Sequence, residues 1–302
     1  MNLISAGLTI GSALLQSQVL GSIFSSNQST KSSGASSAGD LFSTLLSQQQ
    51  SKHAAQPALA ALLNPGQSSN GLSANGRNLS LLNPEAGYNL STFINSRDVL
   101  YKAQYSGLSQ IKAGVSQLQA AGESLGDINA NTPAAGVEAL LQNFVERYNH
   151  WRETYSADVA DGGLLDKVQA AEISLYQFEQ SIKNPFLGAK DDIRGLRELG
   201  ISIDPNTQLA KLDTQQLAAT LSAKPQAVVH TIQDFSAQFA KSAALLNSDN
   251  NFIPNQLNNL SRAIHYIADN QVALKLEFGT GDPAKPNARV AQALAAYNRQ
   301  YA

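Results

Sequence analysis

The sequence predicts a mainly α-helical chain with one small β-hairpin, an α+β fold in which long heptad helices flank a compact head. Apolar residues recur at alternating three- and four-residue spacings over residues 90–125 and again over residues 257–278, which is typical of helices packed along a heptad seam. Between these regions, two short segments of alternating apolar and polar residues surround the turn sequence Pro205-Asn206-Thr207, which predicts a hairpin.

Composition excludes several classes of protein. The 302 residues are 43% hydrophobic and only 15% charged, with a formal net charge of −2. Because binding to phosphates needs a cationic excess, nucleic acid is not expected as a partner. The chain contains no cysteine, which excludes disulfides, thiolate catalysis and cysteine-ligated metals.

Residues 1–86 form a low-complexity region that is predicted to be flexible. Only five charged residues occur between residues 1 and 96, and the only aromatic residues before Tyr88 are Phe24 and Phe42. Such a segment buries too little apolar surface to offset the entropy of ordering it. Brief helical turns are expected only over residues 40–50 and 57–63.

The first 24 residues are uncharged and moderately apolar. No Lys or Arg precedes Lys31, so the basic region of a cleaved secretory signal peptide is missing. Polar residues and glycines interrupt the segment too often for a membrane helix, which needs about 20 predominantly apolar residues, so membrane insertion is not expected. Two interpretations stay open: an amphipathic segment that packs on a partner, or an uncleaved export signal of the flagellar type.

A long N-terminal stem helix is predicted over residues 87–128. Its seam places apolar residues at the first and fourth heptad positions: Tyr101, Leu108, Ile111, Val115, Leu118 and Leu125. Gly107 and Gly114 recur beside this seam, and each costs roughly 1 kcal/mol in a helix interior unless another backbone approaches closely there. The seam belongs either to the core of an ordinary bundle or to a coiled coil between subunits.

Residues 129–253 are expected to form the compact head. A helix is predicted to begin after Thr132-Pro133, with Thr132 as its N-cap, and to break at Asp161-Gly162-Gly163. Another helix is predicted to carry apolar residues from Leu165 to Ile182 and to end near Asn184-Pro185. Trp151, which has charged neighbours, is expected to be a half-buried anchor.

The rest of the head contains the hairpin, with predicted strands Leu199–Asp204 and Gln208–Asp213. Asp213 is expected to cap a helix over residues 214–222, and Lys224-Pro225 to begin the next helix. Residues 254–302 are expected to form a C-terminal stem helix and a tail, broken at residues 279–286. The second seam consists of Leu257, Leu260, Ile264, Ile267, Gln271, Leu274 and Phe278.

The sequence predicts no catalytic, cofactor-binding or metal-binding residues. The histidines (His53, His150, His230 and His265) do not occur at the three- or four-residue spacing of a helical metal site. Phosphate-binding loops and nucleophile-elbow motifs are also missing. Asp204, with Asn206 and Gln208, resembles a calcium loop only faintly, because Leu209 stands where that loop needs glycine. These residues are therefore interpreted as a turn.

Residues 195–232 resemble the C-terminal region of the flagellar hook-associated protein 2 family, the filament cap proteins. Within GLRELGISIDPNTQLAKLDTQQLAATLSAKPQAVVHTI, the family pattern falls on Leu196, Leu199, Gly200, Ile201, Asp204, Leu209, Leu212, Asp213, Leu217, Leu221, Pro225 and Val228. The segment VEALLQNFVERYN also resembles the family's FVxxYN helix through Phe144, Val145, Tyr148 and Asn149. The chain departs from the family by lacking its large variable middle domains.

The resemblance implies a non-enzymatic structural protein of the bacterial flagellum, exported without a cleaved signal peptide. A cap-like protein of this kind would self-associate through its stem helices at the filament tip and support flagellin incorporation. The expected partners are copies of the chain itself, flagellin and other hook-associated proteins. The residues expected at the interface are Tyr101, Leu108, Ile111, Val115, Leu118, Leu260, Ile264 and Ile267.

Two other hypotheses are considered beside this one. The chain could be a cytosolic or secreted coiled-coil adaptor that keeps the head fold without taking part in filament assembly. A hydrolase would need a pocket that gathers His150, His230 or Asp191.

Overall fold

The computed structural model describes residues 84–183 and 193–301. The flexible region predicted at the N-terminus, with its helical turns, lies outside the described residues except for residues 84–86. Those three residues are helical, so the prediction is wrong for them. Asp191 also lies outside the described residues. Within the described part, the prediction of a mainly helical chain with one small hairpin is confirmed. The elements there are helices and a single two-stranded antiparallel sheet.

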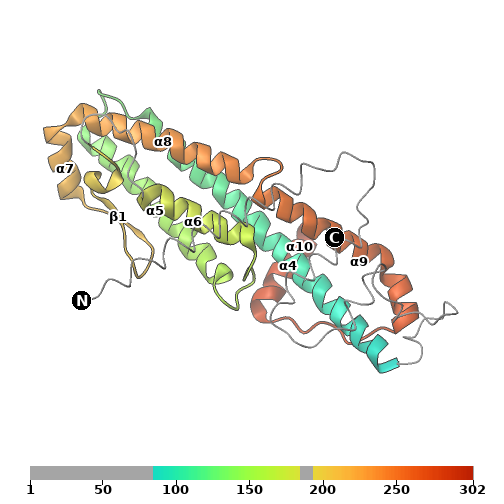
Figure 1. Cartoon of the computed structure of the whole chain (residues 1–302). Coiled ribbons are helices and arrows are strands. Elements are labelled where there is room, and N and C mark those ends of the chain that lie inside the picture. The colour runs from blue at the N-terminus through green and yellow to red at the C-terminus, as the bar shows by residue number, and fades with distance from the viewer. Residues whose placement is uncertain (1–83, 184–192, 302) are drawn as a thin grey trace, which may run out of the picture.

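The longest helix, α4 (Pro84–Glu123), runs along the long axis of the molecule (Figure 1). Its 40 residues span about 60 Å at ~1.5 Å per residue. Helices α8 (Pro225–Asn247) and α9 (Phe252–Phe278) follow one another along α4 in the opposite direction. The Asn247 side-chain amide donates to the Lys112 carbonyl at 3.0 Å, and the Ser91 hydroxyl donates to the Gly279 carbonyl at 2.7 Å. The two predicted stem regions therefore pair within one chain.

Helices α5 (Ala134–Val159) and α6 (Gln169–Lys183) pack beside the second half of α4, after the short 3₁₀ helix η3 (Ser124–Asp127). The N-cap prediction at Thr132 is wrong. Its hydroxyl instead accepts the Asn129 backbone N–H at 3.0 Å and closes the preceding turn, which leaves Pro133 at the start of α5. The predicted start of the following helix is also wrong, because Leu165 is buried in the turn before α6 with its N–H on the Asp158 carbonyl.

The hairpin consists of β1 (Ile201–Ile203) and β2 (Ala210–Leu212), with Ile201 opposite Leu212. Both strands are shorter than predicted. Before β1, residues Leu196–Leu199 form the 3₁₀ helix η4, and Gly200 follows with a φ of 87°, which favours glycine. A Cβ on Gly200 would lie 2.5 Å from the Asp213 carbonyl oxygen, so the chain turns there only because the position is glycine.

The helix starts predicted at Asp213 and Pro225 are confirmed. One carboxylate oxygen of Asp213 accepts the N–H groups of Gln215 and Gln216, each at 3.0 Å, at the start of α7 (Thr214–Ala223). Pro225 occupies the first turn of α8, where its missing N–H leaves no helical hydrogen bond unmade. The last helix, α10 (Ala288–Tyr301), follows the predicted break and packs on α4.

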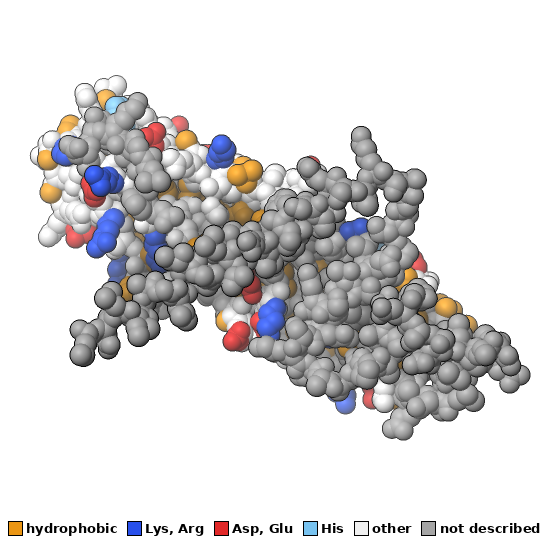
Figure 2. All heavy atoms as spheres, viewed as in Figure 1, with side chains coloured by type: hydrophobic (Ala, Val, Ile, Leu, Met, Phe, Trp, Pro, Cys, Tyr) orange, Lys and Arg blue, Asp and Glu red, His pale blue; other side chains and the backbone are white. Residues whose placement is uncertain are grey.

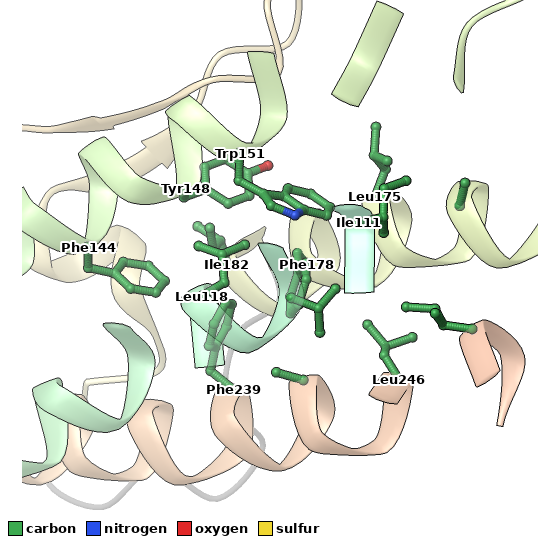
Figure 3. Close-up of a cluster of buried hydrophobic side chains, with 14 of the residues drawn as sticks. Ile111, Leu118, Phe144, Tyr148, Trp151, Leu175, Phe178, Ile182, Phe239 and Leu246 are labelled. Carbon is green, nitrogen blue, oxygen red and sulfur yellow. The ribbon is translucent and has the colours of Figure 1, made fainter. Parts of the chain in front are cut away.

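An aromatic cluster joins α5, α6 and α8 (Figure 3). The Phe239 ring centroid lies 5.0 Å from that of Phe144 and 5.1 Å from that of Phe178, and Trp151 lies 5.0 Å from Phe178. Trp151 is only 4% exposed, so the half-buried position expected for it is wrong. Edge and offset contacts of this kind add to the free energy of burying the rings.

The deeper burial of Trp151 depends on Gly114 of α4. A Cβ at Gly114 would lie 2.7 Å from Cδ1 of Trp151 and 2.9 Å from Cε2 of Tyr155. One heptad earlier, a Cβ at Gly107 would lie 3.0 Å from a methyl carbon of Leu164. The glycines beside the seam therefore admit large side chains of the same chain rather than the backbone of a partner.

We expect Gly114→Ala to destabilise the protein by about 1–3 kcal/mol, because the added methyl group overlaps the Trp151 ring. An alanine normally stabilises a helix by roughly 1 kcal/mol relative to glycine, so the sign of the effect is diagnostic. Urea denaturation would measure it. Gly136→Ala is the control, since its Cβ would meet a methyl group of Thr132 at 3.3 Å and Cδ of Pro133 at 3.8 Å, and no aromatic ring. Equal stabilisation by both substitutions would contradict the packing described for Gly114.

Candidate interaction surfaces

All residues predicted at the interface lie in the core of the single chain. Each is at most 4% exposed: Tyr101, Leu108, Ile111, Val115, Leu118, Leu260, Ile264 and Ile267. They hold α4 against the other helices of the same molecule, so a second chain would reach them only if those helices separated. A subunit interface through these side chains stays a prediction, and the surfaces open to a partner in this structure are formed by other, exposed residues.

The hairpin is held to α5 by the side-chain amide of Asn149. Its nitrogen donates to the Ala210 carbonyl at 2.9 Å, and its oxygen accepts the Ala210 N–H at 2.7 Å. The amide thus bonds to β2 as a neighbouring strand would. The hydroxyl of the preceding residue, Tyr148, donates to the Gln208 carbonyl at 3.4 Å. Burial raises the pKa of Tyr148 to about 12, so this phenol keeps its proton at neutral pH.

These contacts join the two segments that carry the resemblance to cap proteins. Asn149 and Tyr148 belong to the FVxxYN segment, and Ala210 and Gln208 belong to the hairpin about 60 residues later. Phe144 and Val145 of the same segment are buried in the core. The sequence pattern therefore describes one folding unit in which α5 supports the hairpin.

Asp204 closes the hairpin turn, as the sequence predicted. One carboxylate oxygen accepts the N–H groups of Asn206 at 2.9 Å and Thr207 at 3.0 Å, and the other faces the Lys211 ammonium at 3.3 Å. These backbone hydrogen bonds, with Lys211 as a smaller contribution, lower the pKa of Asp204 from 3.8 to about 2. The carboxylate is thus engaged by its own turn.

Helix α10 is fixed to the rest of the chain at both ends. Near its start, the Arg289 guanidinium donates to both carboxylate oxygens of the buried Asp158, at 2.7 and 2.5 Å. Near its end, the rings of Tyr297 and Tyr301 pack edge-on against Tyr105 of α4, with centroid distances of 5.7 and 5.3 Å. Between these contacts, Ala293 is the one residue of α10 that is buried, and the partly buried Val290 also packs against the core.

A groove of about 350 Å³ runs between α4 and α5. Leu118, Trp151 and Tyr155 contribute apolar surface to it, and the polar lining includes Glu146 and His150. His230 on α8 is not among the lining residues, and Asp191 lies outside the described residues, so the groove does not gather the residues that a hydrolase was expected to use. Among the described residues, no three His, Asp or Glu side chains are placed to hold a metal ion.

In the described part of the chain, the exposed large apolar side chains all lie on helices, and two of them share one side of α9. Val272 is 71% exposed and Leu276 is 84% exposed, on consecutive turns. With the exposed Ala268 one turn earlier, they form a stripe that we call the α9 outer face. The other exposed large apolar residues of the described chain are Tyr88, Tyr176, Leu245 and Tyr301.

The charged side chains do not form a single docking patch on the face shown in Figure 2, where basic and acidic groups are interspersed. Through residues 84–183 and 193–301, none of the helices is long and apolar enough to cross a lipid bilayer.

Several of these features were beyond the reach of sequence reasoning. Asn149 and Asp158 look like ordinary polar positions on a helix, and their partners Ala210 and Arg289 are 61 and 131 residues away. The apolar residues of the α9 outer face lie off the heptad seam of the same helix, and the seam is the stronger pattern. A count of apolar residues off the seam is the one signal that would have found Val272 and Leu276.

No family model, curated protein or solved structure matches this chain. The resemblance to cap proteins therefore rests on residues 195–232 and on the segment VEALLQNFVERYN.

We expect Asn149→Ala to destabilise the protein by about 2–3 kcal/mol, because it leaves the buried backbone N–H and C=O of Ala210 without partners. Urea denaturation would measure the loss, and hydrogen exchange at the Ala210 amide would rise more than at amides of α9. Asn143→Ala, at an exposed position on the same helix, should change stability by less than about 0.5 kcal/mol. Equal effects of the two substitutions would contradict the role assigned to Asn149.

The hairpin should weaken in acid because the pKa of Asp204 is lower in the folded state. Between pH 3.8 and about 2, the unfolded chain binds a proton that the folded turn does not, so the contribution of Asp204 to stability is present above this window and is lost as the pH falls through it. The stability difference between the wild type and Asp204→Asn should therefore shrink from pH 4 to pH 2. An NMR titration that placed the Asp204 pKa near 4 would refute this account.

Proposed function

We propose that this chain is a non-enzymatic structural protein of the bacterial flagellum, cap-like, which self-associates and supports flagellin incorporation at the filament tip. The observation that carries the proposal is the pair of hydrogen bonds between Asn149 and Ala210. They join the two separate segments that resemble cap proteins into one unit, which favours a shared fold over a chance likeness of two short stretches. Fold alone does not determine function, so the role in assembly is inferred through kinship.

In this proposal, the paired α4 and α9, with α10, form a stem, and α5 to α8 with the hairpin form a head. Association through the buried seam would require the stem helices to separate, so the outer surface of the stem is the more direct place for contacts between subunits. Export through the flagellar channel would use the low-complexity N-terminal region. Flagellin and hook-associated proteins are the proposed partners.

One observation favours the second candidate, a cytosolic or secreted adaptor that keeps the head fold. The seam residues, including Leu108 and Leu260, are fully covered within one chain, so the seam needs no second copy to bury it. An adaptor would remain a monomer or dimer, and its deletion would leave motility unchanged.

Self-association and export together test the proposal. Sedimentation velocity at micromolar concentration should show an oligomer, and the protein should occur in the secreted fraction of the cells that make it. Ala113→Glu on α4 and Ala295→Glu on α10 place a carboxylate on two exposed positions of the stem. At least one of them should weaken association about tenfold or more, because burying a new charge at an interface is costly.

The matched control is Ala139→Glu on the exposed side of α5 in the head, which should leave association unchanged. A protein that sediments only as a monomer and stays inside the cell would overturn the proposal. A monomer that is secreted, with unchanged motility after deletion, would support the adaptor instead.

A further inference from the structure

The last turns of α9 are apolar on two sides. The seam side, with Ile264 and Ile267, is buried. At about 100° per residue, Val272 and Leu276 each lie roughly 160° around the helix from Leu274, so the α9 outer face is almost opposite the seam. Leu276 is the most exposed large apolar residue of the described chain. Helices that carry apolar residues on opposite sides are typically covered by other segments on both of those sides.

No described segment covers the α9 outer face. Helix α10 packs on α4, and the chain between α9 and α10 is bound to α4 through Asn95, whose side-chain amide donates to the carbonyls of Thr280 and Asp282. The face offers two large side chains and one alanine, which is far less than the ~800 Å² per partner of a stable interface between separate molecules. A surface this small favours an occupant that is already tethered to the chain, because the tether supplies a high effective concentration.

The N-terminal part of the chain, which lies outside the described residues, joins α4 near the end of α9, on the seam side of that helix. Helix α4 starts at Pro84, and the hydrogen bond from Ser91 to the Gly279 carbonyl, just after α9, places the start of α4 next to the end of α9. A flexible linker of the length of residues 25–83 has a root-mean-square span of roughly 40–45 Å. The stripe from Ala268 to Leu276 is only about 12 Å long, so the first residues of the chain reach it readily.

The first 24 residues have the chemistry that such a face requires. They contain no charged side chain, and Ile4, Leu8, Leu15 and Val19 recur at four- and seven-residue spacings, which would place them on one side of a helix. We propose that residues 1–24 dock in cis on the α9 outer face. This inference does not depend on the proposed function, because it concerns the single chain.

Cross-linking of the full-length protein tests the docking, since the chain has no cysteine of its own. Ser12→Cys or Ser17→Cys would each be combined with Ala268→Cys and treated with a short bismaleimide at a concentration where the protein is monomeric. At least one pair should give an intramolecular product of monomer mass in high yield. Replacing Val272 and Leu276 by serine should reduce that yield at least fivefold, with the helical circular dichroism unchanged.

The matched control pairs the same N-terminal cysteines with Ala139→Cys, an exposed alanine at the start of α5. Its intramolecular yield should be at least fivefold lower, because α5 begins beyond the opposite end of α4. Equal yields at the two positions, or a yield that does not respond to the serine substitutions, would overturn the proposal. A product of dimer mass would assign the face to a second copy and would also overturn it.

Discussion

Burial of one side of α4 holds most of the described helices together. Helices α5, α8, α9 and α10 all contact this one helix, and its seam residues, such as Leu108 and Val115, are fully inaccessible. Truncating either side chain to alanine would leave a cavity in the core, and such substitutions of large apolar residues typically cost 2–5 kcal/mol. The glycines beside the seam extend the same constraint, because they let Trp151 and Leu164 approach α4 at a distance that a side chain would prevent.

The parts of the fold that could be predicted are those in which the physical signal is local. Asp213 caps α7 because its carboxylate accepts the N–H groups of the residues that follow it, and this contact does not depend on distant parts of the chain. The heptad spacing of α4 and α9 likewise predicts a buried seam, whether the helix that covers it belongs to the same chain or to another. Thr132 shows the limit of this reasoning, since its hydroxyl serves either a helix or the preceding turn, and only the path of the backbone at Asn129 decides between them. The burial of Trp151 depends on a glycine 37 positions earlier, and no local pattern joins the two.

The candidate surfaces were harder to predict for a related reason. A heptad seam looks the same whether it is filled within one chain or between subunits, because the hydrophobic effect does not distinguish their sources. Tyr101 and Ile264 were therefore equally consistent with a core and with an interface. Residues that remain exposed after folding, such as Val272 and Leu276, carry information about partners only once the intrachain contacts are known.

The clamp between Asn149 and Ala210 also bears on what the resemblance to cap proteins means. Two strands of three residues do not hold together alone in water, so the hairpin needs α5, and Asn149, one of the residues that carry the resemblance, supplies that contact. Gly200, Asp204 and Asp213 serve the same unit by turning or capping the chain. Because each of these residues is accounted for by folding, the resemblance is evidence for the fold of the head. The evidence about assembly has to come from the outer surfaces of the stem, where none of these residues lies.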